Sequence, residues 1–323
     1  MISSNFGKKF IMGGLNEIND INVKIRKLQI NDGVRLHTCN DYGNSLEVIK
    51  IASTGIQNKV KIISKIYYKY PDPSNRRFRP LIDQIKEQKN RLDFIPMEWD
   101  IQLCCYVKFK ELISKNAKLF FKYINESFGI KNVYLEYYPV YNYTVENIYN
   151  LNKSYKGQIT FGFLGYDNIL NGVFQENISK KLDKSSIPLI YVGILGFGNQ
   201  NENFFKELDK KKVISLNLIY FLKNYYKYSN LLGITQASSL KHYENLKEIY
   251  LKLIKEKSQI NSNSFSKYLI NKVYYSSQYD HYGSYFSLIY LLRKPKLIIS
   301  ILKRKLLIKF KSQRFNNNFF GNN

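Results

Sequence analysis

Short apolar runs alternate with longer amphipathic runs along most of this sequence, and this alternation constrains the fold more than any other feature. Short apolar runs are typical of buried strands, and the amphipathic runs between them are typical of helices that cover a sheet. The pattern therefore predicts repeated strand–helix units around a parallel sheet. The predicted strands are residues 9–13, 34–38, 60–66, 101–107, 132–139, 158–164, 172–175, 187–193 and 231–235.

Amphipathic runs between these strands predict the helices. The clearest are residues 80–91, 109–127, 144–155, 203–210, 213–226 and 239–255. Pro80 suits the first position of a helix, where its missing N–H group costs no hydrogen bond. The fold class that we predict, a (β/α)₈ TIM barrel, needs eight strands, whereas nine are predicted. Two explanations stay open: either the strand at 9–13 is a lid, or the segment near 101–107 is an insertion.

Length and composition indicate a globular protein. The 323 residues are enough to bury a large core, and 44% hydrophobic residues argue against extended disorder. The three cysteines, Cys39, Cys104 and Cys105, lack metal-ligand spacing, so we expect reduced thiols and no metal site. The N-terminus lacks the apolar core of a signal peptide, and no run approaches about 18 apolar residues. We therefore expect a cytoplasmic protein.

The formal net charge of +25 has two explanations. The chain is rich in Lys, Asn, Ile and Tyr, so the charge fits a compositional background. Alternatively, it attracts the phosphates of a cofactor, a nucleic acid or an anionic lipid surface. Aromatic residues are frequent everywhere in the chain, so they do not indicate base stacking, and we expect no specific nucleic-acid partner.

The most informative motif follows the second predicted strand. Residues 33–45 read Gly-Val-Arg-Leu-His-Thr-Cys-Asn-Asp-Tyr-Gly-Asn-Ser. The segment resembles the strand-to-helix motif of the aldo-keto reductases, in which Asp-Thr-Ala is followed two residues later by Tyr-Gly-Asn-Ser. Tyr42 and the three residues after it match this motif, whereas His37 occupies the position of the aspartate. Weaker similarities to the family occur on both sides of this motif, in the same order as in the family. They lie at residues 10–14, 60–65, 155–162, 173–177, 232–234 and 243–246.

The resemblance implies carbonyl reduction by a nicotinamide cofactor, NADP or NAD. Tyr42 would donate the proton, and Lys65 would lower the pKa of that phenol by favouring the phenolate. Both lie at the C-terminal ends of successive predicted strands, where the active sites of barrels form. His37 would take an altered supporting role, because an imidazole cannot pair with a lysine as a carboxylate does.

The histidine of the family is also replaced. If the strand at 132–139 carries its position, Tyr137 stands there and can donate a hydrogen bond to a carbonyl oxygen; if the strand at 101–107 does, Cys104 stands there and would donate poorly. On the cofactor side, Gln175 matches a residue that stacks near the nicotinamide. The Ser-Asn pair that binds the carboxamide reads Leu164-Gly165 here.

The end of the barrel resembles a phosphate site. Ser238 and Ser239 precede a predicted helix whose N-terminal amides can bind a phosphate. Glu244 and Asn245 lie in the segment that resembles the family's phosphate-side helix. We therefore expect these four residues to belong to the cofactor site.

The sequence changes character after residue 256. We divide it into a barrel at 1–256 and a linker with a basic tail at 257–323, in which Ser and Asn are frequent at 258–266. Residues 288–311 mix apolar and basic side chains and predict an amphipathic helix. Such a helix would contact the inner face of a membrane through its basic residues. Alternatively, it packs on the barrel with its lysines solvated.

The sequence thus predicts an NAD(P)(H)-dependent oxidoreductase acting on a carbonyl or hydroxyl group of a small, sugar-derived substrate. The alternative is a catalytically degenerate barrel that serves as a binding or scaffold protein, for example in surface-polysaccharide biosynthesis. A third hypothesis is different chemistry around Glu136 and the Cys104-Cys105 pair.

Overall fold

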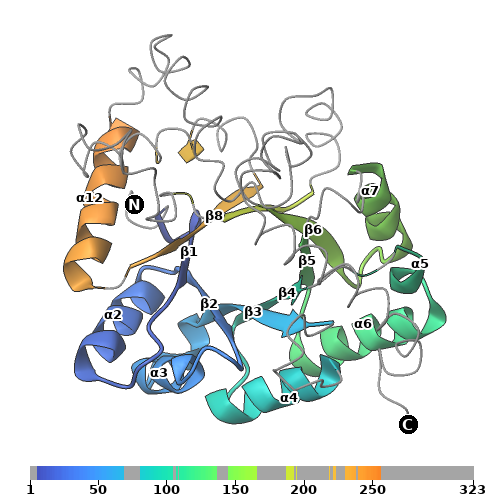
Figure 1. Ribbon diagram of the computed structural model, residues 1–323, viewed down its shortest axis with the longest axis horizontal. Helices are drawn as coiled ribbons and strands as arrows, with labels where there is room; N and C mark the ends of the chain where they lie inside the picture. The colour runs from blue at the N-terminus through green and yellow to red at the C-terminus, as the bar shows by residue number, and fades with distance from the viewer. Residues whose placement is uncertain are drawn as a thin grey trace, which may run out of the picture.

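Eight parallel strands close into a barrel in the order in which they occur along the chain, with helices around its outside (Figure 1). The computed structural model describes residues 6–68, 81–104, 107, 109–136, 145–165, 187–192, 194, 218, 221–222, 230–237 and 239–255. The strands are β1 (Phe10–Gly13), β2 (Arg35–Cys39), β3 (Lys61–Tyr67), β4 (Glu98–Cys104), β5 (Asn132–Glu136), β6 (Thr160–Gly165), β7 (Leu189–Val192) and β8 (Leu231–Gln236). The helices are α2 (Asp20–Asn31), α3 (Ser45–Ala52), the 3₁₀ turn η1 (Gln57–Lys59), α4 (Leu81–Leu92), α5 (Phe109–Leu112), α6 (Lys115–Phe128), α7 (Val145–Ser154) and α12 (Leu240–Lys255).

The barrel confirms the predicted fold class and corrects the strand count. β1 pairs with β2 and β8, so the first predicted strand is not a lid. β4 lies between β3 and β5, so the segment near 101–107 is not an insertion. The barrel closes without residues 172–175, which lie outside the described residues, because β6 pairs directly with β7. Both explanations were wrong because a short apolar run does not by itself distinguish a barrel strand from another apolar segment.

Several predictions concern residues outside the described part of the chain. They include the boundary after residue 256, the tail at 257–323 with its membrane contact at 288–311, and the helix at 203–210. Among the helices that the structure describes, none has the length and apolar character needed to cross a membrane.

The alternation of strand residues divides the core into two layers. The outer layer packs between the barrel and the helices and includes Phe10, Trp99 and Phe161. Because successive residues of a strand face opposite sides, their neighbours fill the interior of the barrel. This inner layer comprises Ile11, Ile63, Tyr134, Leu164, Ile190 and Ile234.

A cluster of charges occupies the N-terminal ends of β2, β3 and β4, beneath the inner layer. Glu98 accepts hydrogen bonds from Arg35 and, at 2.6 Å, from the Lys61 ammonium. Asp100 accepts a bond of 2.8 Å from Asn132 Nδ2 and lies 3.6 Å from Arg35 Nε. Burial raises the pKa of Asp100 to about 6, although Asn132 and Arg35 act in the opposite direction. The hydrogen bond from Asn132 and the charge of Arg35 therefore do not fully offset the cost of burying the charged carboxylate of Asp100.

We expect Asp100→Asn to stabilise the protein at neutral pH. The folded-state pKa of Asp100 lies above the value of 3.8 expected in the unfolded chain. Its contribution to stability is therefore fully present below about pH 4 and is lost as the pH rises towards about 6. The substitution should raise the free energy of unfolding at pH 7 by about 1–3 kcal/mol and leave it nearly unchanged at pH 4.

Urea unfolding at the two pH values measures this effect. Asp93→Asn is the control, because the Asp93 side chain is 75% exposed. A larger loss of stability for Asp100→Asn at pH 7 than at pH 4 would contradict the expectation.

Candidate functional site

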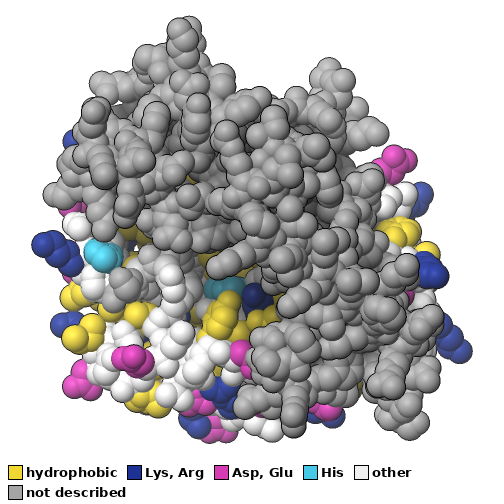
Figure 2. Space-filling model, viewed as in Figure 1, with side chains coloured by type: hydrophobic (Ala, Val, Ile, Leu, Met, Phe, Trp, Pro, Cys, Tyr) yellow, Lys and Arg dark blue, Asp and Glu magenta, His cyan; other side chains and the backbone are white. Residues whose placement is uncertain are grey.

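Polar side chains converge at the C-terminal ends of β2, β3 and β4. The register pairs Cys39 with Lys65 and Lys65 with Gln102, which places these three residues at one level of the barrel. Because Ile63 faces the interior, strand alternation turns Lys65 and Tyr67 to the same side. In Figure 2 a histidine and a basic side chain lie near the centre of the molecule, between hydrophobic side chains. This end of a (β/α)₈ barrel is where active sites form.

Tyr42 lies in the turn that connects β2 to α3. Its N–H donates to the carbonyl of Cys39 at 3.2 Å, and its own carbonyl accepts from the N–H of Ser45 at 2.9 Å. The Tyr42 ring meets the His37 ring edge to face, with 5.7 Å between the ring centroids. The turn therefore brings Tyr42 back to the inward-facing side chains of β2.

His37 is held by a neighbour two strands away. The ring is 9% exposed, and its Nε2 lies 2.7 Å from Oε1 of Gln102. The amide nitrogen of Gln102 donates to Cys104 Sγ at 3.4 Å, which leaves its oxygen directed at the histidine. Since an amide oxygen only accepts, His37 carries its proton on Nε2 in this amide orientation. In the neutral ring, Nδ1 is then an acceptor, as the carboxylate of the family motif would be, but without negative charge.

Lys65 and Tyr42 both act on the phenol of Tyr67. The Lys65 ammonium lies 5.3 Å from the centroid of the Tyr67 ring. Burial raises the pKa of Tyr67, the charge of Lys65 lowers it, and Tyr42 is among the groups that raise it. Burial also raises the pKa of Cys39 to about 11, against the opposing effects of Lys65 and of a hydrogen bond with Tyr67. The raised pKa favours the protonated thiol of Cys39 near neutral pH.

A buried arginine shapes the rim of the site at the end of β1. Arg26 of α2 is fully buried and donates to the carbonyls of Met12, at 3.2 Å, and of Gly14. Burial lowers the pKa of Arg26 to about 9, and no carboxylate of the described residues contacts it. Gly14 and Leu15 follow with φ of +74° and +65°, so the chain turns sharply here. Asn16 then accepts from the N–H of Asn44 at 3.0 Å and so joins this rim to the Tyr42 turn.

The predicted site residues have different outcomes. The structure brings together Tyr42, His37 and the strand of Lys65, whereas Tyr137, Gln175 and Ser238 lie outside the described residues. Cys104 and Tyr137 were the two alternatives for the histidine position of the family. Cys104 ends β4, which pairs with the strand of Lys65, and Tyr137 comes directly after β5 in the sequence. Leu164, at the expected carboxamide position, packs in the apolar interior of the barrel.

The remaining cofactor candidates lie at the start of α12. The hydroxyl of Ser239 accepts from the N–H of His242 at 3.2 Å, as a helix-capping serine does. Glu244 and Asn245 follow on α12, where Glu244 is exposed and Asn245 half-buried. Because α12 comes directly after β8, its N-terminus lies at the same end of the barrel as Tyr42.

Sequence reasoning missed Gln102 and Tyr67. For Tyr67 a signal exists in the alternation of strand residues, since Tyr67 lies two positions after Lys65 and therefore faces the same way. Gln102 could not be found by that signal until β4 was recognised as the neighbour of β3.

The fold is similar to that of solved aldo-keto reductases, although no family model and no curated protein matches the sequence. One is an aldo/keto reductase from Klebsiella pneumoniae in complex with NADP and acetate, with 13% identity and a TM-score of 0.56, covering 83% of this chain and 91% of that one. A thermostable aldo-keto reductase in complex with the inhibitor epalrestat has 14% identity and a TM-score of 0.53, covering 80% and 93%. A glycerol dehydrogenase from Gluconobacter oxydans has 13% identity and a TM-score of 0.52, covering 82% and 90%. The chain thus has an aldo-keto-reductase-like (β/α)₈ barrel fold.

Proposed function

We propose that this protein is an NAD(P)(H)-dependent oxidoreductase of aldo-keto reductase type, acting on a carbonyl or hydroxyl group of a small, sugar-derived substrate. The observation that carries the proposal is the convergence of Tyr42, His37 and the end of the Lys65 strand at one end of the barrel. The solved structures with this fold include reductases crystallised with NADP or NADPH, which supports the choice of cofactor class.

The residues present fit part of a nicotinamide cofactor. Ser239 and the first turn of α12 would hold a phosphate, because a helix N-terminus presents unpaired N–H groups and a positive dipole end. The carboxamide end has lost its polar pair, since Leu164 is buried among apolar side chains. The bound cofactor would supply the hydride, and the side chains of the barrel would handle the proton.

In the proposed mechanism Tyr42 donates its hydroxyl proton to the carbonyl oxygen of the substrate. Lys65 supplies a positive charge near the phenols and so favours the phenolate that remains. His37, fixed by Gln102, offers a neutral acceptor where the family motif has a carboxylate. A neutral acceptor stabilises an ammonium group less than a carboxylate does.

The rival function is a catalytically degenerate barrel that binds a ligand or partner, for example in surface-polysaccharide biosynthesis. His37 in place of a carboxylate and the apolar surroundings of Leu164 favour it. The two functions differ in one measurable property, because only the oxidoreductase needs to bind a nicotinamide cofactor. Contact of residues 288–311 with a membrane is compatible with both.

We expect saturable binding of NADPH at submillimolar concentration. The binding is measured from the fluorescence of Trp99 and of the cofactor. Ser239→Asp should weaken this binding at least tenfold, about 1.4 kcal/mol, because aspartate still caps the helix but repels a phosphate. Ser114→Asp is the matched control, since Ser114 caps α6 in the same way, with its hydroxyl 3.2 Å from the N–H of Ala117. No binding of NADPH at millimolar concentration would contradict the proposed redox function. Equal effects of both substitutions would show that the cofactor phosphate does not bind at the N-terminus of α12.

We expect Tyr42→Phe to lower kcat for NADPH-dependent reduction of glyceraldehyde by about 100-fold or more, because it removes the proton donor. The dissociation constant of NADPH should stay within twofold, since the phenol is assigned to the substrate oxygen. Tyr67→Phe provides the comparison within the same site. If Tyr67→Phe abolishes turnover while Tyr42→Phe retains it, Tyr42 is not the proton donor.

A further inference from the structure

Helix α4 directs three polar side chains at the barrel instead of at solvent. Gln84, Gln88 and Arg91 are spaced by four and three residues, so they lie on one face of the helix. Gln84 and Gln88 are 6% and 0% exposed. Burying polar side chains costs free energy unless they are hydrogen-bonded. Their hydrogen-bond partners therefore show which parts of the chain this face of α4 holds in place.

The two glutamines bind the backbone of the strand that carries Lys65. Cys39 is the last β2 residue in register with β3, opposite Lys65, whereas β3 continues to Tyr67. Beyond that point Gln84 pairs with β3: its Oε1 accepts from the N–H of Tyr67 at 2.9 Å, and its Nε2 donates to the carbonyl of Tyr67 at 3.0 Å. Gln88 Nε2 donates to the carbonyl of Lys65 at 3.3 Å.

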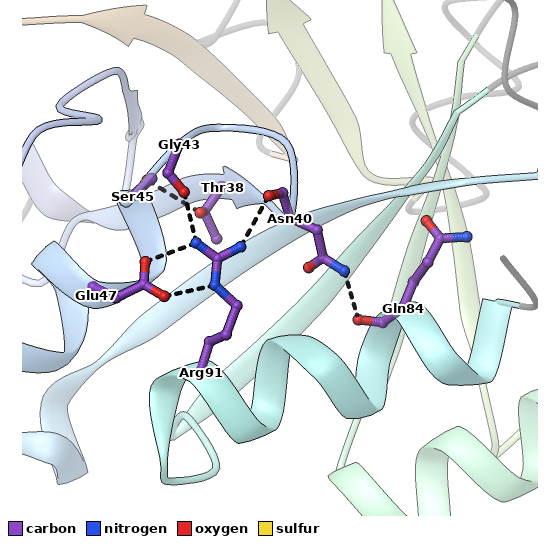
Figure 3. Close-up of polar contacts among 7 residues, drawn as sticks. All are labelled: Thr38, Asn40, Gly43, Ser45, Glu47, Gln84 and Arg91. Carbon is purple, nitrogen blue, oxygen red and sulfur yellow. Dashed lines mark hydrogen bonds and ion pairs between the residues drawn. The ribbon is translucent and has the colours of Figure 1, made fainter. Parts of the chain in front are cut away.

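Arg91 binds the turn that carries Tyr42 (Figure 3). Its guanidinium donates to the carbonyls of Asn40, at 2.9 Å, and Gly43, at 2.6 Å, on either side of Tyr42. It also donates hydrogen bonds to both carboxylate oxygens of Glu47 in the first turn of α3, at 2.6 and 2.7 Å. The hydrogen bonds from Arg91 are the largest cause of a lowered pKa of Glu47. Figure 3 also shows the Asn40 amide reaching the carbonyl of Gln84, at 3.3 Å, so the turn meets α4 at two places.

We propose that Arg91 is a positioning residue that fixes Tyr42 relative to Lys65. One rigid helix holds the backbone of Lys65 and Tyr67 through its glutamines and the turn around Tyr42 through its arginine. The inference rests on the proposed function for its catalytic consequence, but the positioning itself does not. An arginine is required because its planar fork binds a carboxylate with two bonds and still reaches two carbonyls, which the point charge of a lysine cannot do.

The competing explanation is that Arg91 only docks α4 against α3. The chain offers a matched control for this. Lys50 of α3 pairs with Asp93, directly after α4, at 3.2 Å, and their side chains are 46% and 75% exposed. This ion pair bridges the same two segments of chain but has no hydrogen bond to the Tyr42 turn. Lys50→Met therefore removes a bridge between them and leaves the Arg91 contacts in place.

Hydrogen exchange tests the positioning without reference to any reaction. The N–H groups of Tyr42, Asn44 and Ser45 donate at 3.2, 3.0 and 2.9 Å to the carbonyls of Cys39, Asn16 and Tyr42. We expect Arg91→Lys to speed exchange of these three amides at least tenfold and Lys50→Met to leave them unchanged. Unchanged exchange in Arg91→Lys, or equal acceleration in both variants, would overturn the proposal.

Kinetics test the catalytic consequence. Arg91→Lys should lower kcat for NADPH-dependent reduction of glyceraldehyde at least tenfold, with KM for glyceraldehyde and the NADPH dissociation constant within twofold of wild type. Lys50→Met should match the wild type. Equal losses of kcat in both variants would show that Arg91 acts only through helix docking. If the wild-type protein does not bind NADPH, the proposed function fails, and the exchange experiment still decides whether Arg91 positions the turn.

Discussion

Closure of eight parallel strands into one barrel is the constraint on which the rest of the structure depends. It directs alternate side chains of every strand into a common interior, so His37, Lys65 and Gln102 lie on adjacent strands facing that interior although they are far apart in the sequence. It also separates two polar regions, with a charged cluster at the N-terminal ends of the strands and the candidate site at the C-terminal ends. Ile63 is in register with both His37 of the site and Asp100 of the charged cluster, so the two polar regions adjoin the same apolar interior.

His37, at the position where the aldo-keto reductase motif has a carboxylate, is held in place by two neighbouring side chains. Gln102 contacts one ring nitrogen and the Tyr42 ring packs against the imidazole, so the His37 side chain has a defined place. At the rim, Arg26 binds the carbonyls of Met12, in β1, and of Gly14, just after it, and Arg91 binds two carbonyls of the Tyr42 turn.

The parts of the structure that could be predicted from sequence are those encoded locally. Short apolar runs located the eight strands, and the Tyr-Gly-Asn-Ser motif located Tyr42. The strand count went wrong because apolar character says nothing about which runs pair. Tyr67 could have been found from the alternation of strand residues, whereas Gln102 depends on strand register, which is a non-local property. Arg91 lies 44 positions from Glu47 along the chain, and no spacing in the sequence connects the two.

We propose that the phenol of Tyr42 and the ammonium of Lys65 work as one unit. A double-mutant cycle on kcat with Tyr42→Phe, Lys65→Met and the double variant tests it most directly. If the two groups act together, Lys65→Met should cost almost nothing further once Tyr42 is gone, so the double variant should be about as slow as Tyr42→Phe. Losses that multiply in the double variant would contradict the account, because they would show two side chains acting independently.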